Sequence, residues 1–274
     1  MEAGFENCTV VVSVRMSSQR PRLNHQLIDL LEPVTRWLGE EYFDADVRGV
    51  DRWPEGPALV VGNHNAGIVT PDSFILYGEL VRQHGVDALP VALAHELLFR
   101  VPLLRDVLTA GRAVPAGPES AAKALEKGHK VLVYPGGDWE THRPSRHRDR
   151  IDFGGRRGFV RLALEAKVPV IPVVTAGAHD GWYVLTRGDW IARSLGLDRL
   201  FRIKVFPIAF GLPTGLIIGP ATLHLPLPTE MIIDVGEPIE LQGDPESAED
   251  VQRGYDLVTW TMQERLTELA AELR

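Results

Sequence analysis

The sequence predicts an α/β protein in which helices flank a central sheet that is mixed but mainly parallel. Two observations predict this class. Short apolar runs of strand length alternate with longer segments whose apolar residues recur every three or four positions. The chain also has 274 residues, of which 45% are hydrophobic and 24% are charged, so it can bury a substantial core. Such alternation produces parallel strands with both faces covered.

The N-terminal part of the chain is expected to contain a leader and a helix. Residues 1–22 are mostly polar and are expected to be loosely ordered, although the valines at 10–12 could form a short strand. Across residues 23–43, leucine, valine and tryptophan recur with helical spacing, which predicts an amphipathic helix. Its apolar face either packs on the core or rests on a membrane.

The middle of the chain supplies the predicted sheet and its covering helices. The sequence Thr70-Pro71-Asp72 combines an N-cap residue, a first-turn proline and an acid, and therefore starts a helix. Strands are expected at residues 58–62, 88–94, 129–134, 168–175 and 231–235. The helix that starts at Thr70 is expected to extend over residues 70–83, and further helices are expected at residues 96–109, 120–127 and 157–166.

The C-terminal part divides into an irregular segment and a long helix. Residues 206–228 are apolar, but their prolines and three glycines exclude a long helix. The segment is either an irregular buried loop or a membrane-facing surface. Residues 248–274 show helical spacing to the end of the chain. Residues 23–274 are expected to form a single domain.

Charge and cysteine content exclude several classes. The formal charge of −8 gives no bulk attraction to nucleic acid or to anionic lipid. The single cysteine, Cys8, excludes a disulfide framework and a cysteine-rich zinc site, and it fits a reducing cytoplasmic setting. We expect no secretory signal at the N-terminus and no spanning helix, because no apolar run reaches the required length of about 18 residues.

The strongest candidate site is Gly62-Asn63-His64, at the carboxyl end of a predicted strand. Sites in open α/β sheets are built at such ends. A neutral histidine can take the proton from an attacking hydroxyl, and a carboxylate such as Asp72 would fix its tautomer. Alternatively, His64 only caps a turn and Asp72 only stabilises the start of a helix.

A second candidate is the glycine turn Pro135-Gly136-Gly137, which follows another strand. Paired glycines let backbone N–H groups approach an oxyanion or a phosphate, although such a sequence is commonly just a tight turn. The loop that follows holds the densest group of cations, which either is solvated or binds a phosphorylated donor or a membrane surface. These cations are Arg143, Arg146, Arg148, Arg150, Arg156 and Arg157.

Other sites are not indicated. The histidines at 95, 129, 179 and 224 lack metal-ligand spacing, so no metal is expected. Ser120 lacks the Gly-x-Ser-x-Gly turn of a hydrolase nucleophile. Neither a dinucleotide-binding glycine motif nor a phosphate-loop lysine is present.

Four ordered blocks within about residues 55–242 resemble the glycerolipid (lysophospholipid, 1-acylglycerol-3-phosphate) acyltransferase superfamily. Asn63-His64 with Asp72 is similar to the family's Asn-His-x4-Asp block, but seven residues separate the pair and Val69 occupies the strict acid position. The second block is 111–117, where Gly117 replaces a phosphate-binding arginine. The third, Tyr134-Pro135-Gly136-Gly137, resembles the neutral-lipid branch. The fourth is 168–172, preceded by Arg156-Arg157.

This resemblance implies a glycerol-3-phosphate acyltransferase-like fold and an O-acyltransferase that moves a fatty acyl group from acyl-CoA or acyl-carrier protein to a lysophospholipid or related lipid hydroxyl. His64 would be the general base and Asp72 its orienting acid. Oxyanion or substrate binding would fall to Asn63, Gly136, Gly137, Arg112, Arg156 and Arg157. No cofactor beyond the acyl donor is implied, and the expected place is the cytoplasmic, inner face of a membrane, as a peripheral protein.

Three alternatives remain open at this point. The acceptor could be a neutral glyceride or alcohol, because the phosphate-site residues of the family are replaced. The same His64 and Asp72 pair could activate water in an acyl-thioester hydrolase. Finally, the chain could be a lipid-binding protein that keeps the fold with a degenerate site.

Overall fold

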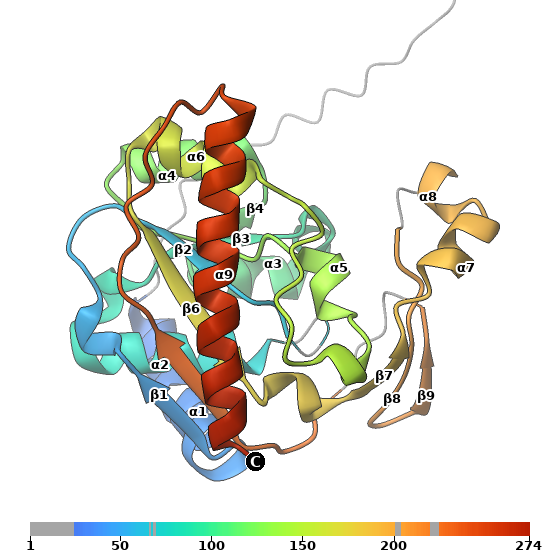
Figure 1. Ribbon diagram of the computed structural model, residues 1–274. Coiled ribbons are helices and arrows are strands. Elements are labelled where there is room, and N and C mark those ends of the chain that lie inside the picture. The colour runs from blue at the N-terminus through green and yellow to red at the C-terminus, as the bar shows by residue number, and fades with distance from the viewer. Residues whose placement is uncertain (1–24, 66, 68–69, 201–203, 220–224) are drawn as a thin grey trace, which may run out of the picture.

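The computed structural model describes residues 25–65, 67, 70–200, 204–219 and 225–274. The predicted leader, its valine run and Cys8 lie outside the described residues. The described chain forms a central sheet with helices on both faces and a smaller sheet to one side (Figure 1).

The central sheet has seven strands in the order β1-β10-β6-β2-β5-β3-β4. Every neighbouring pair is parallel except β10 and β6, which are antiparallel, so the predicted mixed and mainly parallel sheet is confirmed. The strands are β1 (Ala45–Arg48), β2 (Leu59–Gly62), β3 (Val91–Ala94), β4 (Val114–Pro115), β5 (Val131–Val133), β6 (Val170–Ala176) and β10 (Met231–Val235). Among these, β1 and β4 have no counterpart in the sequence prediction.

Alternate residues of the buried strands point into two separate cores. Leu59 and Val61 of β2 pack with α4, α6 and α9, whereas Val60 packs with α2 on the other face. The helices are α1 (His25–Trp37), α2 (Pro71–His84), α3 (Pro102–Ala110), α4 (Pro118–Glu126), α5 (Gly137–Thr141), α6 (Gly158–Ala166), α7 (Asp189–Ser194), α8 (Leu197–Leu200) and α9 (Ala248–Glu272). Both faces of the sheet are therefore covered, as parallel strands require.

The two predicted end helices are present. The helix expected at 23–43 corresponds to α1 followed by a π-helical turn at Leu38–Tyr42. The helix expected at 248–274 is α9, which crosses in front of the sheet in Figure 1. Its N-cap is Ser247, whose hydroxyl accepts a hydrogen bond from the Asp250 N–H at 3.3 Å, as N-cap serines do.

The structure departs from what the sequence predicts in two segments. The helix expected at 96–109 is divided into a 3₁₀ turn, Glu96–Arg100, and α3. Pro102 causes the division, because proline has no N–H for a continuing helix and disfavours helical geometry in the preceding residue. Residues 206–228 are also not an irregular loop throughout, since they contain two strands, β8 (Ile208–Gly211) and β9 (Gly215–Ile218).

These two strands form a small antiparallel sheet with β7 (Tyr183–Thr186), in the order β7-β8-β9. Its inner face buries a compact cluster of Trp182, Val184, Ala209 and Ile217. The small sheet lies beside α5, on the opposite side of α9 from α1 and β1 in Figure 1. The alternation of inward and outward residues along β8 and β9 was hidden by the prolines and glycines around them.

Candidate functional site

His64 lies directly after β2, which is flanked by β5 and β6 near the centre of the sheet. The preceding residue, Asn63, fixes the point where the strand ends. Its side-chain amide donates to the Thr175 carbonyl at 2.9 Å, and its side-chain oxygen accepts from the Thr175 N–H at 2.8 Å. The Asn63 side chain therefore pairs with the backbone of β6 in place of a further strand residue. Its amide group is used in these two hydrogen bonds.

The backbone of His64 is held from both sides. Its N–H donates to Glu140 Oε2 at 2.9 Å, and its carbonyl accepts from an Arg143 guanidinium nitrogen at 2.7 Å. The imidazole lies against the Tyr134 ring, with 4.9 Å between the ring centroids. The N–H and the carbonyl of His64 are thus both held by residues of the segment that follows β5.

The imidazole of His64 is kept neutral by its surroundings. Its Nδ1 is buried and has no hydrogen-bond partner within the part of the chain that the structure describes. Burial lowers the pKa of His64 to about 4, because the protonated ring loses its hydration there. At neutral pH the ring can therefore accept a proton, which is the property that a general base needs.

Asp72 lies in the first turn of α2, close to the same loop. Its Oδ2 accepts a hydrogen bond from the Asn65 side-chain amide at 3.1 Å, and its Oδ1 accepts from the Ser73 N–H at 3.0 Å. Burial raises the pKa of Asp72 to about 6. Within the described residues, Asp72 is connected to the His64 loop through Asn65 and not by a hydrogen bond to the imidazole.

Sequence reasoning gave no role to Glu140, which the structure places at the centre of the site. The side chain is fully buried, with 0% exposure, and its second oxygen accepts from the Asp152 N–H at 3.2 Å. Burial raises the pKa of Glu140 to about 7. An acid three residues after a strand-ending glycine pair was the available signal, since an acid there can turn back toward the strand end.

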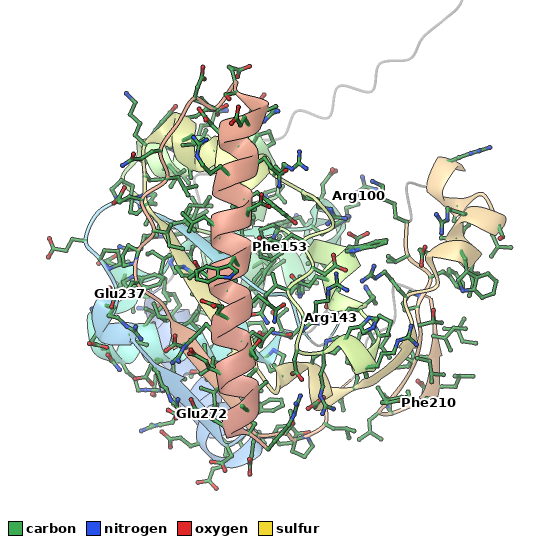
Figure 2. The ribbon with its side chains drawn as sticks, viewed as in Figure 1. Arg100, Arg143, Phe153, Phe210, Glu237 and Glu272 are labelled. Carbon is green, nitrogen blue, oxygen red and sulfur yellow. The ribbon has the colours of Figure 1, made fainter. Side chains whose placement is uncertain are left out.

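Arg143 was predicted to belong to a solvated or phosphate-binding loop, but it is a buried structural residue with 1% exposure (Figure 2). Its guanidinium donates to four acceptors, which leaves no N–H group for an external anion. The acceptors are the carbonyls of His64 (2.7 Å), Glu140 (3.1 Å) and Arg148 (2.8 and 3.2 Å), and the side-chain oxygen of Asn65 (2.7 Å).

The glycine turn borders this cluster. A Cβ at Gly136 would overlap the Glu140 carboxylate, so only glycine fits there. Gly137 has φ = +46°, and its N–H donates to the Tyr134 carbonyl at 3.0 Å. The structure therefore brings the turn to the His64 peptide, with the N–H of Gly137 already used inside the turn.

The three predicted substrate-binding arginines lie in different places. Arg156 donates to the Gly136 carbonyl at 2.7 Å and to Asp138 at 2.6 Å, so it secures the glycine turn. Arg157 is exposed and lies 5.9 Å from the centre of the Tyr255 ring. Neither makes a described contact with the imidazole.

Arg112 is not brought to the site at all. It donates to the carbonyl of Leu89, which precedes β3, at 3.2 Å. His64 instead follows β2, and β2, β5 and β3 run parallel. In parallel strands all the amino ends lie along one edge of the sheet and all the carboxyl ends along the other. Arg112 contacts the amino end of β3, whereas His64 follows the carboxyl end of β2, so the two residues lie at opposite edges.

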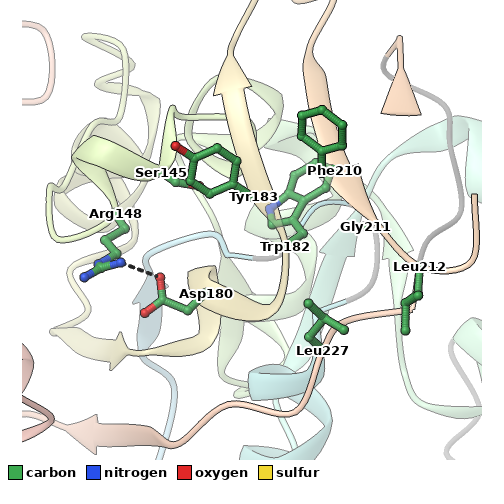
Figure 3. Close-up of a pocket in the computed structure, with 9 residues that line it drawn as sticks. All are labelled: Ser145, Arg148, Asp180, Trp182, Tyr183, Phe210, Gly211, Leu212 and Leu227. Carbon is green, nitrogen blue, oxygen red and sulfur yellow. Dashed lines mark hydrogen bonds and ion pairs between the residues drawn. The ribbon is translucent and has the colours of Figure 1, made fainter. Parts of the chain in front are cut away.

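A pocket of about 380 Å³ lies between the small sheet and the segment 142–148, whose Ser145 and Arg148 line it (Figure 3). Arg143 of the same segment donates to the His64 carbonyl. Arg148 and Asp180 form an ion pair of 3.2 Å at one side of the pocket. The ring of Trp182, which lines the pocket, is 5.6 Å from that of His142. The lining residues are Ser145, Arg148, Asp180, Trp182, Tyr183, Phe210, Gly211, Leu212 and Leu227.

Neither a metal-binding cluster nor a membrane span is evident in the described residues. They contain no group of three or more histidine, cysteine, aspartate or glutamate side chains arranged to hold a metal ion. None of their helices has the length and apolar character needed to cross a bilayer.

Comparison with known proteins points to one family. The acyltransferase family model matches residues 44–176, a range that includes His64, the glycine turn, Glu140 and Arg143. The chain is 30% identical over 211 residues to an uncharacterized protein of Mycobacterium tuberculosis, covering 77% of this chain and 56% of that one. It is also 32% identical over 171 residues to the human DGAT1/2-independent enzyme synthesizing storage lipids, covering 61% and 48%. The chain spans about half the length of these curated relatives.

A solved structure confirms the architecture. The crystal structure of the 1-acyl-sn-glycerophosphate acyltransferase PlsC from Thermotoga maritima superimposes with a TM-score of 0.56, covering 90% of this chain and 80% of that one. Its sequence identity of 18% shows a shared fold alone. This shared architecture agrees with the family match, which identifies residues 44–176 as an acyltransferase domain.

Proposed function

We propose that this protein is an O-acyltransferase that moves a fatty acyl group from a thioester, acyl-CoA or acyl-carrier protein, to the hydroxyl of a lipid acceptor. The observation that carries the proposal is the neutral His64 imidazole at the carboxyl end of β2, with its peptide fixed on both sides. Only a neutral imidazole can take a proton, and a fixed peptide keeps the ring in one place.

In the proposed reaction, His64 removes the proton of the acceptor hydroxyl as that oxygen attacks the thioester carbonyl. The tetrahedral intermediate carries a negative oxygen, which the backbone N–H of Gly136 would stabilise, because the N–H of Gly137 already donates to the Tyr134 carbonyl. The intermediate then collapses, the carbon–sulfur bond breaks, and the imidazolium returns its proton to the departing thiolate. No covalent enzyme intermediate and no further cofactor are needed.

The proposal gives Asp72 a positioning role. Its carboxylate is hydrogen-bonded to Asn65, the residue after His64, and Asn65 in turn accepts from Arg143. A negative charge close to the loop also favours the imidazolium that forms during the reaction. We therefore expect Asp72 to influence His64 indirectly, by helping to fix the orientation of the imidazole ring through Asn65.

For the acceptor, a neutral glyceride or alcohol is better supported than a lysophospholipid such as 1-acylglycerol-3-phosphate. A phosphate needs cations with free donors, but Arg143 uses all its donors internally and Arg156 is paired with Asp138. Arg112 contacts the opposite edge of the sheet. The name of the human relative, an enzyme synthesizing storage lipids, agrees with a neutral acceptor.

Acyl acceptors of this kind dissolve in membranes, so the proposal includes peripheral attachment to the cytoplasmic face of a membrane. The exposed apolar side chains of α1, among them Leu30, Val34 and Trp37, support this attachment. They match the amphipathic pattern that the sequence shows there.

The deciding experiment uses purified protein, labelled acyl-CoA or acyl-carrier protein, and a panel of lysophospholipids, glycerides and simple alcohols, with products identified by mass. An acylated neutral lipid supports the proposal. His64→Ala should lower turnover by roughly a hundredfold or more, because a general base contributes about that much. Near-normal turnover in a correctly folded His64→Ala protein would contradict the mechanism.

The rivals are separated in the same assay. A thioester hydrolase would release free fatty acid at the same rate with and without an acceptor. A lipid-binding protein with a degenerate site would release no thiol from acyl-CoA in a His64-dependent way.

A further inference from the structure

The outward face of the small sheet is almost entirely apolar. We use the term outer face for Tyr183, Leu185, Phe210, Leu216 and Ile218, whose exposed fractions lie between 44% and 57%. These residues come from all three strands, and the register places Tyr183 beside Phe210 and Phe210 beside Leu216. They therefore form one continuous patch.

Folding of the small sheet does not require this patch. The inner face already buries the cluster of Trp182, Val184, Ala209 and Ile217. An antiparallel sheet with one covered face ordinarily carries polar residues on the other. Large exposed apolar patches on soluble domains mark sites of interaction.

The apolar surface continues beyond the strands. Leu212, Leu225 and Leu227, which are 40–61% exposed, follow or precede the strands, and Trp190 and Leu195 are 58–59% exposed on and just after α7. Figure 3 shows that Phe210, Tyr183, Leu212 and Leu227 surround the pocket, so the patch is hollowed and not flat.

The charge of this region differs in sign from that of the whole protein. Between residues 182 and 228 there are five basic residues against two acidic ones, a net charge of +3 in a chain whose formal charge is −8. The basic residues are Arg187, Arg193, Arg199, Arg202 and Lys204, and the acidic ones are Asp189 and Asp198. Arg187 is paired with Asp152 and Arg193 with Asp189, so the surplus of positive charge in this segment comes from Arg199, Arg202 and Lys204. An apolar patch with such a surplus in the same segment is complementary to a bilayer with anionic headgroups.

The patch is also connected to the exposed side of the N-terminal helix. The Tyr42 hydroxyl donates to the Pro226 carbonyl at 3.0 Å, and the Trp37 ring lies 5.6 Å from that of Tyr42. Trp37 is 53% exposed, and Leu225 and Leu227 flank Pro226. The segment that follows the small sheet thus contacts the turn that follows α1, and exposed apolar side chains lie on both sides of this contact.

We propose that the outer face of the β7-β8-β9 sheet is a membrane-docking surface that seats the protein on an anionic lipid bilayer. The choice of a bilayer as occupant rests on the proposed function, since a lipid acceptor must be reached in a membrane. The segment 142–148 connects this surface to the site, since Ser145 and Arg148 line the pocket and Arg143 donates to the His64 carbonyl.

The test is flotation of the full chain with vesicles of phosphatidylcholine containing phosphatidylglycerol, compared with phosphatidylcholine alone. The variants are Phe210→Glu and Ile218→Glu on the outer face. Trp260→Glu on α9 is the matched control, because Trp260 is 59% exposed and lies on another surface. Circular dichroism and the elution volume of each variant establish that it folds.

We expect the wild type and the Trp260 variant to float with the anionic vesicles, and the two outer-face variants to bind roughly tenfold more weakly or worse, since a carboxylate is strongly unfavourable in the apolar boundary. Equal binding by all variants, loss in the control alone, or no flotation of the wild type would overturn the proposal. So would a dimer in solution that Phe210→Glu dissociates, because the occupant would then be a second copy.

This result is independent of the chemistry. Thiol release from a short-chain acyl-CoA with a water-soluble alcohol needs no bilayer and reports on the proposed reaction alone. Flotation without such turnover would leave the docking surface intact and count against the acyltransferase, whereas turnover without flotation would do the reverse.

Discussion

Replacing Glu140 with glutamine tests the central feature of the site, the buried carboxylate that holds the His64 peptide. Its two oxygens accept from the N–H groups of His64 and Asp152 at 2.9 and 3.2 Å. Glutamine keeps one acceptor but presents an amide donor to the other N–H. One of the two peptide groups is then left buried without an acceptor.

The size of the effect follows from that lost acceptor. A buried donor without a partner costs about 1–3 kcal/mol. Glu140 is also the carboxylate that most favours the charge of the buried Arg143, which holds the His64 carbonyl. If the peptide of His64 relaxes to recover a partner, the imidazole moves with it, and a loss of 1–3 kcal/mol in the transition state corresponds to a kcat about 5- to 150-fold lower.

The assay measures kcat, KM and the free energy of unfolding for Glu140→Gln, with Glu126→Gln as a control because Glu126 is an exposed glutamate on α4. We expect kcat to fall with KM nearly unchanged in the first variant, and no change in the second. A Glu140→Gln protein that is less stable but has wild-type kcat per folded molecule would refute the positioning role. Glu140→Asp keeps the charge but has a shorter side chain, so its kcat should lie between those of the Glu140→Gln and Glu126→Gln proteins.

Four further outcomes are expected. Because burial lowers the pKa of His64 to about 4, the acid limb of kcat/KM attributable to this base should lie well below pH 6.5, and a limb near 6.5 in a pH–rate profile would contradict the neutral buried ring. Between pH 6.5 and 4 the unfolded chain binds a proton at His64 that the folded chain does not, so His64→Ala should lose less stability than the wild type on acidification, by at most about 3 kcal/mol in denaturant titrations. Gly136→Ala should reduce kcat at least roughly tenfold while KM stays similar, because its Cβ would displace the Glu140 carboxylate. Arg112→Ala should leave kcat within about twofold of the wild type, since its contacts lie at the opposite edge of the sheet, and a large fall in kcat at unchanged stability would place it in the site after all.

The part of the site that the sequence predicts is the part that depends on local pattern. The apolar run before Asn63-His64 identifies a buried strand, and the end of a parallel strand is where a sheet presents side chains. The glycine turn is visible in the same way. Glu140 and Arg143 are different, because their contacts with His64 join residues 76 and 79 positions apart. No local pattern encodes a pairing of that length.

The small sheet shows the same limit in the fold. Strands β8 and β9 have four residues each, and prolines and glycines surround them, so their period of two is too short to recognise. Their partner β7 precedes them by more than 20 residues. The central strands β2, β3, β5, β6 and β10 could be predicted because each is mainly apolar, and β2, β6 and β10 are buried throughout. The small sheet is instead specified by pairing across intervening helices.

The same reasoning explains the unusual spacing between His64 and Asp72. Seven residues separate them where the family pattern has four, so the acid comes three positions later in the sequence, in the first turn of α2. A displaced acid needs a connection to the histidine loop, and the Asn65 side chain supplies one by donating to Asp72 and accepting from Arg143. Thr141 holds the loop from α5 by donating to the carbonyls of Asn65 and Gly67 at 3.3 and 2.8 Å. Asn65 and Gly67 are therefore held by the segment after the glycine turn, which also holds the His64 peptide. The spacing departs from the family pattern without freeing the histidine.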